Sequence, residues 1–138
     1  MVHVSKDLVI RPIGRVESTL TTREDAPRQG DEGAPDAWLV FTENVREALK
    51  DLTVGDDVML ITWFDRADRD VLAVHPRDDL ARPMTGVFST RSPDRPNPLG
   101  LHRVTILAIN DLRLQVSNLE ALDGTPLVDV KPVLGDER

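Results

Sequence analysis

A proline-rich connection between two β-prone runs most limits what this chain can fold into. Pro93, Pro96 and Pro98 lie within six residues, after an apolar run at residues 86–90 and before another at residues 101–109. Each proline fixes its own φ, lacks a backbone donor and biases the preceding residue toward extended backbone. We therefore expect a stiff loop that joins two strands.

This loop carries side chains suited to recognition. Arg91, Arg95 and Asn97 present planar hydrogen-bonding groups, and a rigid backbone would hold them in fixed positions for a carboxylate, a phosphate or a purine edge. On composition alone, a proline-stiffened surface turn with solvated arginines explains the same residues equally well.

The remaining chain predicts short strands separated by turns. Asn110 and Asp111 supply turn chemistry for a hairpin, residues 123–126 form a second tight turn, and Gly14 marks a bulge or a close backbone approach. This spacing indicates a mainly β fold, either an antiparallel β-barrel or a sandwich. The predicted strands are residues 7–17, 37–41, 57–64, 71–74, 86–90, 101–109, 112–116 and 127–133.

Two segments are expected to differ from this pattern. Residues 18–36 are rich in Pro, Gly and charge, which predicts a long surface loop of the kind that is often functional. Residues 43–50 are predicted to form one short helix, capped by Thr42, with Val45 and Leu49 on its apolar face.

Length and charge exclude several classes of protein. A chain of 138 residues suits one domain covering residues 1–138. Its net charge of −7 argues against broad, charge-driven nucleic-acid binding, so any RNA contact must be local. No apolar run is long enough to span a membrane and no signal peptide is evident, which favours a cytoplasmic protein.

Common catalytic and metal-binding patterns are absent from the sequence. His3, His75 and His102 lack metal-site spacing, and the chain has no cysteine, so we expect no metal. Ser89 and Ser92 do not lie in a nucleophile elbow, and no glycine-rich phosphate loop joins a strand to a helix. Asp65, after an apolar strand, either binds a ligand or opens a turn.

Two stretches resemble the signatures of one family. Residues 86–101, GVFSTRSPDRPNPLGL, are similar to the pattern GVFATRSPxRPNPIGL of the TsaA-like family, also called TrmO. Residues 123–132, DGTPLVDVKP, resemble its second signature, DGTPxxDIKPY. The resemblance implies a β-barrel that binds S-adenosylmethionine. It also implies a methyltransferase acting on N6 of threonylcarbamoyl-adenosine next to the tRNA anticodon.

The resemblance also implies site residues. An acceptor-facing basic patch would comprise Arg95, Asn97, His102 and Arg103, and a homodimer would place the loop with Pro27-Arg28-Gln29 over the cofactor near the partner subunit. Asp65 or Asp129 would pair with the positive charge of the cofactor, and Arg28 or Arg91 with its carboxylate. The apolar walls of the pocket would come from Phe88, Leu101 and Leu127. The implied cofactor-binding residues are Pro27, Arg28, Gln29, Asp65, Arg66, Arg91, Leu101, Thr125, Pro126, Leu127 and Asp129.

Some features depart from the family pattern. Val133 stands where the second signature has tyrosine, so a stacking or hydrogen-bonding role is lost there. Full-length relatives continue into a C-terminal domain, which makes this chain similar to a short, barrel-only form, and residues 69–84 are shorter and more acidic than in the tRNA enzymes. These departures keep an alternative open, a non-catalytic or small-molecule-directed S-adenosylmethionine-binding module. No residue is assigned as the proton acceptor that a carbamoylated N6 would need.

Overall fold

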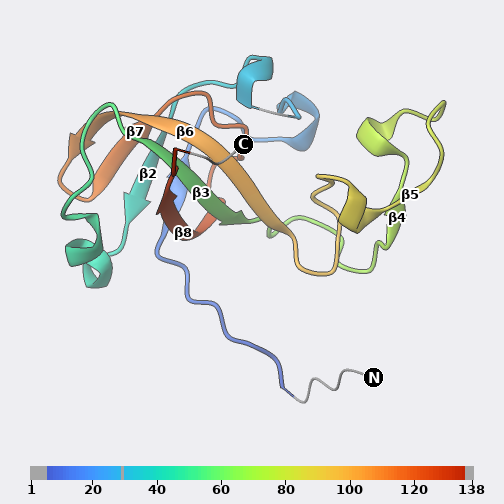
Figure 1. Ribbon diagram of the computed structural model, residues 1–138, viewed down its shortest axis with the longest axis horizontal. Helices are drawn as coiled ribbons and strands as arrows, with labels where there is room; N and C mark the ends of the chain where they lie inside the picture. Colours follow the sequence, from blue (N-terminus) through green and yellow to red (C-terminus); the bar gives the residue numbers. More distant parts are fainter. Residues whose placement is uncertain (1–5, 29, 136–138) are drawn as a thin grey trace.

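The computed structural model describes residues 6–28 and 30–135 and has an antiparallel barrel as its centre (Figure 1). The barrel closes in the order β1-β2-β7-β6-β3-β8, and each neighbouring pair is antiparallel. This confirms the mainly β, antiparallel barrel fold. The strands are β1 Gly14–Glu17, β2 Ala37–Phe41, β3 Asp57–Trp63, β6 Leu99–Asn110, β7 Arg113–Val116 and β8 Pro126–Pro132.

A separate lobe extends from one end of the barrel. Its two strands, β4 (Ala73–Val74) and β5 (Thr85–Gly86), pair only with each other in the described residues. Figure 1 shows this lobe beside the barrel, joined to it through the end of β3 and the start of β6. The lobe and the barrel end enclose a cavity between them.

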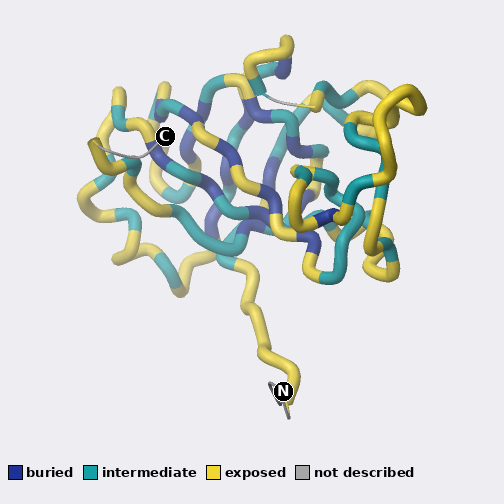
Figure 2. The backbone as a smooth tube through the Cα atoms, turned by 45° about the vertical axis from the view of Figure 1, so that its right-hand side comes forward, coloured by how far each residue is buried: buried dark blue, intermediate teal, exposed yellow. Residues whose placement is uncertain are grey.

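The core fills the barrel interior because strand residues alternate between inward and outward positions. On β6, Gly100, His102, Val104 and Ile106 are buried, while the residues between them are less buried or exposed (Figure 2). Most inward residues are aliphatic, and they pack into one cluster. His102 on β6 and Thr62 on β3 are therefore unusual inward residues, both at the barrel end nearest the lobe.

The helical segments are short 3-10 turns. The expected helix is present as η3 (Glu43–Leu49), but the Thr42 side chain does not cap it; the Thr42 hydroxyl instead donates to the Ile13 carbonyl at 3.3 Å. The other 3-10 turns have three residues each: η1 (Arg23–Asp25), η2 (Gly30–Glu32), η4 (Pro76–Asp78) and η5 (Val87–Ser89).

Two predicted strands are wrong in extent. Residues 7–13 are extended but lie outside the barrel sheet, and Leu8 and Val9 are almost fully exposed. In the predicted strand 86–90, only Gly86 belongs to β5, because the chain then turns into η5, which the Thr90 amide closes by donating to the Val87 carbonyl. Gly14 makes a close backbone approach, since a Cβ there would lie 2.3 Å from the Val40 carbonyl oxygen.

Candidate functional site

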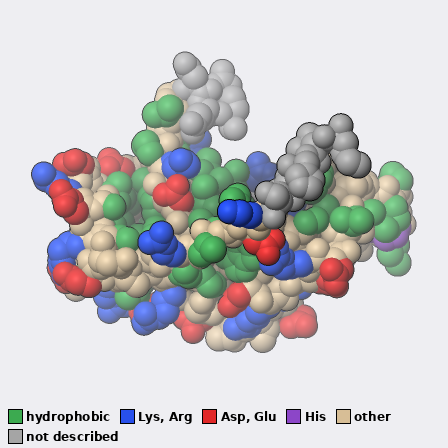
Figure 3. All heavy atoms as spheres, turned by 90° about the horizontal axis from the view of Figure 1, so that it is seen from below, with side chains coloured by type: hydrophobic (Ala, Val, Ile, Leu, Met, Phe, Trp, Pro, Cys, Tyr) green, Lys and Arg blue, Asp and Glu red, His purple; other side chains and the backbone are tan. Residues whose placement is uncertain are grey.

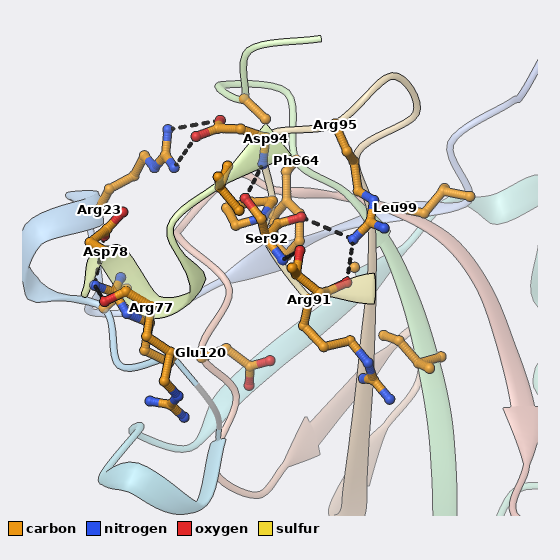
Figure 4. Close-up of a pocket in the computed structure, with 18 of the residues that line it drawn as sticks. Arg23, Phe64, Arg77, Asp78, Arg91, Ser92, Asp94, Arg95, Leu99 and Glu120 are labelled. Carbon is orange, nitrogen blue, oxygen red and sulfur yellow. Dashed lines mark hydrogen bonds and ion pairs between the residues drawn. The ribbon is translucent and has the colours of Figure 1, made fainter. Parts of the chain in front are cut away.

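A cavity of about 670 Å³ lies between the barrel end, the lobe, the proline loop and residues 23–28 (Figure 4). This volume is in the range of small-molecule and cofactor pockets. Its apolar lining includes Phe64, Phe88, Leu99, Leu101 and Leu122. The remaining lining is strongly charged, with seven arginines against four carboxylates.

The proline loop, residues 92–98, keeps its shape through Arg95. Because prolines cannot donate, other groups must satisfy the carbonyls of this segment. The Arg95 guanidinium turns inward and donates to the carbonyl oxygens of Thr90 at 3.0 Å, Ser92 at 3.1 Å and Val87 at 2.7 Å. Arg95 is thus an internal brace of the loop.

A second arginine braces the loop from outside. Arg69 donates from Nε to the Pro96 carbonyl at 2.7 Å and from Nη2 to the Asn97 side-chain oxygen at 2.9 Å. Its guanidinium also stacks over Trp63, 5.1 Å from the ring centroid. The charge run at residues 65–70 therefore anchors the proline loop to β3 through Arg69.

Asp94 connects three segments of the cavity wall. Its carboxylate accepts hydrogen bonds from Arg23, at 3.1 and 3.3 Å, and from the Asp68 amide at 2.9 Å. Partial burial opposes ionisation, but the bonds from Arg23 and Asp68 outweigh it and lower the pKa of Asp94. The ionised form is therefore favoured by the folded state.

We expect Asp94→Asn to lower the free energy of unfolding at pH 7. Because the folded-state pKa is lowered, the contribution of Asp94 is present above the unfolded pKa of about 3.9 and disappears as pH falls through the folded value. Urea denaturation at pH 7, 5 and 3 should show the difference from wild type shrinking below about pH 4. Asp70→Asn is the control, because no partner of the Asp70 carboxylate is found in the described residues. A pH-independent difference would contradict this explanation.

Two ion pairs cross the mouth of the cavity. Arg28 bonds to Asp78 at 2.7 Å, and Arg77 bonds to Glu32 at 2.5 Å, so Arg28 and Glu32 are tied to the lobe. All four side chains are substantially exposed, and exposed pairs contribute only about 0.2–1 kcal/mol each. The two pairs are therefore weak links across the mouth of the cavity.

Two charged side chains line the cavity without a protein partner among the described residues. Arg91 extends from the start of the proline loop into the cavity (Figure 4). Asp65, which follows β3, also lines the cavity. No hydrogen bond or ion pair involves either side chain in the described part of the chain. A guanidinium and a carboxylate that are both free match a ligand carrying charges of both signs.

A buried polar chain forms the cavity floor. The His102 side chain is 1% exposed, and its Nδ1 bonds to Glu120. Its Nε2 lies 2.7 Å from the hydroxyl of Thr62, and Phe64 meets its ring edge-on. The β3–β8 register shifts between Ile61 and Thr62, a kind of irregularity that often re-aims side chains near functional sites.

We expect Gly100→Ala to disturb this floor. A Cβ at Gly100 would lie 2.4 Å from the Thr62 hydroxyl oxygen and 2.7 Å from His102 Nε2. Overpacking of this kind costs about 1–3 kcal/mol, which thermal denaturation would measure. The control is Gly86→Ala, because a Cβ at Gly86 would meet nothing within 4 Å. Equal stability of the two variants would contradict the close approach.

The structure brings most predicted cofactor residues to one cavity, but not all. Pro27, Arg28, Asp65, Arg66, Arg91, Leu101 and Thr125 line it. Leu127 is buried in the barrel core, and Pro126 and Asp129 lie on β8 away from the lining. Gln29 lies outside the described residues.

The predicted acceptor patch is not one surface. Arg95 and His102 line the cavity, but both are engaged in internal bonds. Asn97 accepts the bond from Arg69. Arg103 lies on the outer face of β6 and pairs with Asp57 at 3.3 Å, where the Thr105 hydroxyl and Arg103 together lower the pKa of Asp57. These four residues therefore do not form a shared basic face.

Sequence reasoning missed Thr62 and Glu120. Thr62 carried a signal, since it is a polar residue at an inward position of the most apolar strand. Glu120 carried little, because it precedes the second signature without belonging to it.

Within residues 6–28 and 30–135, no helix is long and apolar enough to cross a membrane. The same residues hold no group of three or more His, Asp or Glu side chains that could bind a metal ion.

Comparison with known proteins identifies the family. Residues 15–136 match the model of the tRNA-methyltransferase O N-terminal domain. The chain is 39% identical over 130 residues to a probable S-adenosyl-L-methionine-binding protein of Methanothermobacter thermautotrophicus, covering 94% of this chain and 93% of that one. It is also 39% identical over 124 residues to an S-adenosyl-L-methionine-binding protein of Archaeoglobus fulgidus, covering 90% and 88%.

A solved structure shares the fold. TrmO from Pseudomonas aeruginosa superposes with a TM-score of 0.74 at 29% identity over 96% of this chain. This chain spans 61% of the length of that protein. Since the family model matches most of the sequence and the close relatives match nearly end to end, the chain belongs to the tRNA-methyltransferase O N-terminal domain family.

Proposed function

We propose that the protein binds S-adenosylmethionine in the cavity and transfers its methyl group to an acceptor. One observation carries this proposal: Arg91 and Asp65, of opposite charge and both free in the described structure, share a cavity with apolar walls. Arg91 would bind the α-carboxylate of the cofactor, and Asp65 would face its positive charge. The names of the relatives support the same cofactor.

The sequence left two candidate arginines and two candidate carboxylates for pairing with the cofactor, and contacts in the structure favour one of each. Of the two candidate arginines, Arg28 is already paired with Asp78, whereas Arg91 is available. Of the two candidate carboxylates, Asp65 lines the cavity and Asp129 does not. Phe88 and Leu101 remain as apolar walls, while Leu127 belongs to the core.

The acceptor we propose is N6 of threonylcarbamoyl-adenosine next to the anticodon of a tRNA. The family supports a tRNA substrate, and the surplus of arginine around the cavity gives an acidic protein a local basic site. Positioning of donor and acceptor can contribute about 7–11 kcal/mol to such a transfer. We infer a cytoplasmic location because that is where mature tRNA is found.

A second candidate function is a binding module without methyl transfer. It is favoured by the names of the archaeal relatives, which state binding alone. Incubation of the protein with labelled cofactor and tRNA that lacks the methyl group separates the two. Methyl incorporation into the modified adenosine supports the transferase, and tight binding without transfer supports the module.

We further propose that residues 1–138 act as one domain and pair as a homodimer. The lobe exposes large apolar side chains beside the cavity mouth, with Leu80 81% and Phe88 84% exposed. Hydrophobic side chains gather at the lobe end of the molecule in Figure 3, whereas basic and acidic side chains are interspersed elsewhere on that face. Exposed apolar patches of this kind mark interaction sites, and sedimentation analysis would test the pairing.

A further inference from the structure

The hydrogen bonds that join Thr62, His102 and Glu120 all run in one direction, which is fixed by where the donor protons lie. The Thr62 hydroxyl is fully buried, and the His102 ring nitrogen is its hydrogen-bond partner in the described residues. A buried hydroxyl that left its proton unpaired would pay a desolvation cost of about 1–3 kcal/mol. Thr62 therefore donates to Nε2, and Nε2 carries no proton.

The ring proton of His102 must then lie on Nδ1. Nδ1 faces the Glu120 carboxylate, so the imidazole donates to Glu120. A neutral histidine with Nδ1–H satisfies every donor in this chain, whereas a doubly protonated ring would leave the Thr62 proton without an acceptor. The arrangement holds one oxygen of the Glu120 carboxylate in place.

The carboxylate of Glu120 is presented to the cavity. Its side chain is 14% exposed, and it lines the same space as Arg91. In Figure 4, Arg91 and Glu120 extend into the cavity from different segments of the wall. Among the described residues, His102 is the only side chain that bonds to Glu120, so its remaining lone pairs are open to a ligand.

We propose that Glu120 is the proton acceptor for the acceptor nitrogen, and that His102 and Thr62 are positioning residues that orient it. This inference rests on the proposed methyl transfer. The acceptor nitrogen forms a bond to the methyl carbon as the bond from that carbon to the sulfonium sulfur breaks. The sulfur leaves as a neutral thioether, and the proton of the nitrogen passes to the Glu120 carboxylate. A carbamoylated amine is a weak nucleophile, so removal of this proton matters to the rate.

A carboxylate at this place has one competing use, as an anchor for the positive charge of the cofactor. Asp65, which follows β3, also lines the cavity, and its carboxylate has no partner among the described residues. An anchor also gains nothing from a buried imidazole that fixes one oxygen, whereas a proton acceptor depends on orientation toward the N–H bond.

The test compares Glu120→Gln with wild type in single-turnover methylation of tRNA and in calorimetric binding of the cofactor. Glutamine keeps the size and can still accept from Nδ1–H, so the fold should survive. We expect the rate to fall about 100- to 10,000-fold, the usual contribution of a general base, with the cofactor Kd within threefold of wild type. Glu47→Gln, an exposed change on η3, should leave both unchanged.

A second measurement is independent of activity. The ¹⁵N spectrum of His102 should show a neutral ring with its proton on Nδ1. Thr62→Val should leave that proton on Nδ1 against Glu120, because a proton on Nε2 would have no acceptor beside valine. The ring loses its second hydrogen bond, so the rate should fall while the cofactor still binds. A ring protonated on Nε2 in wild type would overturn the positioning role.

The other outcomes are equally decisive. A Glu120→Gln rate within threefold of wild type would overturn this inference alone. Weaker binding of S-adenosylmethionine, with unchanged binding of the thioether product, whose sulfur carries no charge, would make Glu120 an anchor for the sulfonium and also overturn it. A wild-type protein that binds the cofactor and methylates no tRNA would contradict the proposed function itself.

Discussion

Replacing Arg91 by alanine is expected to weaken S-adenosylmethionine binding by about 1.5–3 kcal/mol, or about 10- to 150-fold in Kd. The reason is that Arg91 is a free guanidinium in the cavity, held at the start of the braced proline loop. Truncation removes a charge-assisted bond to the cofactor carboxylate. Isothermal titration calorimetry measures the change directly.

The control for Arg91 is Arg103→Ala. Arg103 is an exposed arginine that follows the first signature by two residues. It pairs with Asp57 on the outer barrel face, away from the cavity lining. Its removal should leave cofactor affinity unchanged. Unchanged affinity in a folded Arg91→Ala protein would remove Arg91 from the site. An equal loss in both variants would point to a general charge effect, which added salt would screen.

The barrel was predictable because its strands carry complete local signals. Residues 37–41 were expected as a strand and form β2 with those bounds, since AWLVF combines β-prone side chains with buried positions at Ala37, Leu39 and Phe41. The turn at Asn110 and Asp111 likewise predicted the β6–β7 hairpin, where Asp111 adopts a positive φ of 55°. Alternation and turn chemistry act within a few residues, so sequence alone reveals them.

The lobe was harder to predict because its order depends on distant partners. β4 and β5 have two residues each, too few for a periodic pattern. The lobe is linked to the rest of the chain by ion pairs between residues about 50 positions apart, such as Arg28 with Asp78. No local pattern specifies such a pair.

The distance in sequence to the relevant neighbours also explains which site residues were predictable. Asp65 follows the end of β3, and Arg91 lies after η5 within the first family signature, so a strand end and a signature pointed to them. The role of His102 is different, because its partner Glu120 follows 18 residues later, beyond a complete hairpin. Only the closed barrel places that carboxylate against the ring.

Arg95 gives the clearest contrast between position in a motif and role in the structure. The sequence predicts it on an RNA-facing patch, whereas its guanidinium donates to three backbone carbonyls within the loop. Methionine at this position would keep much of the apolar stem and remove all three bonds. The Thr90 and Ser92 carbonyls would then lose the donor that satisfies them in the described residues, while the Val87 carbonyl would keep its bonds from Thr90.

Arg95→Met should therefore lower the free energy of unfolding by at least about 1.5–3 kcal/mol, the range for hydrogen bonds to a charged group. It should also weaken cofactor binding, because a loosened loop no longer holds Arg91 in the cavity. Urea denaturation and calorimetry on the same samples measure both effects. Arg91→Ala is the matched control, since it should lose affinity with little change in stability. If Arg95→Met kept full stability and lost only tRNA methylation, Arg95 would be an RNA contact and its bracing role would be wrong.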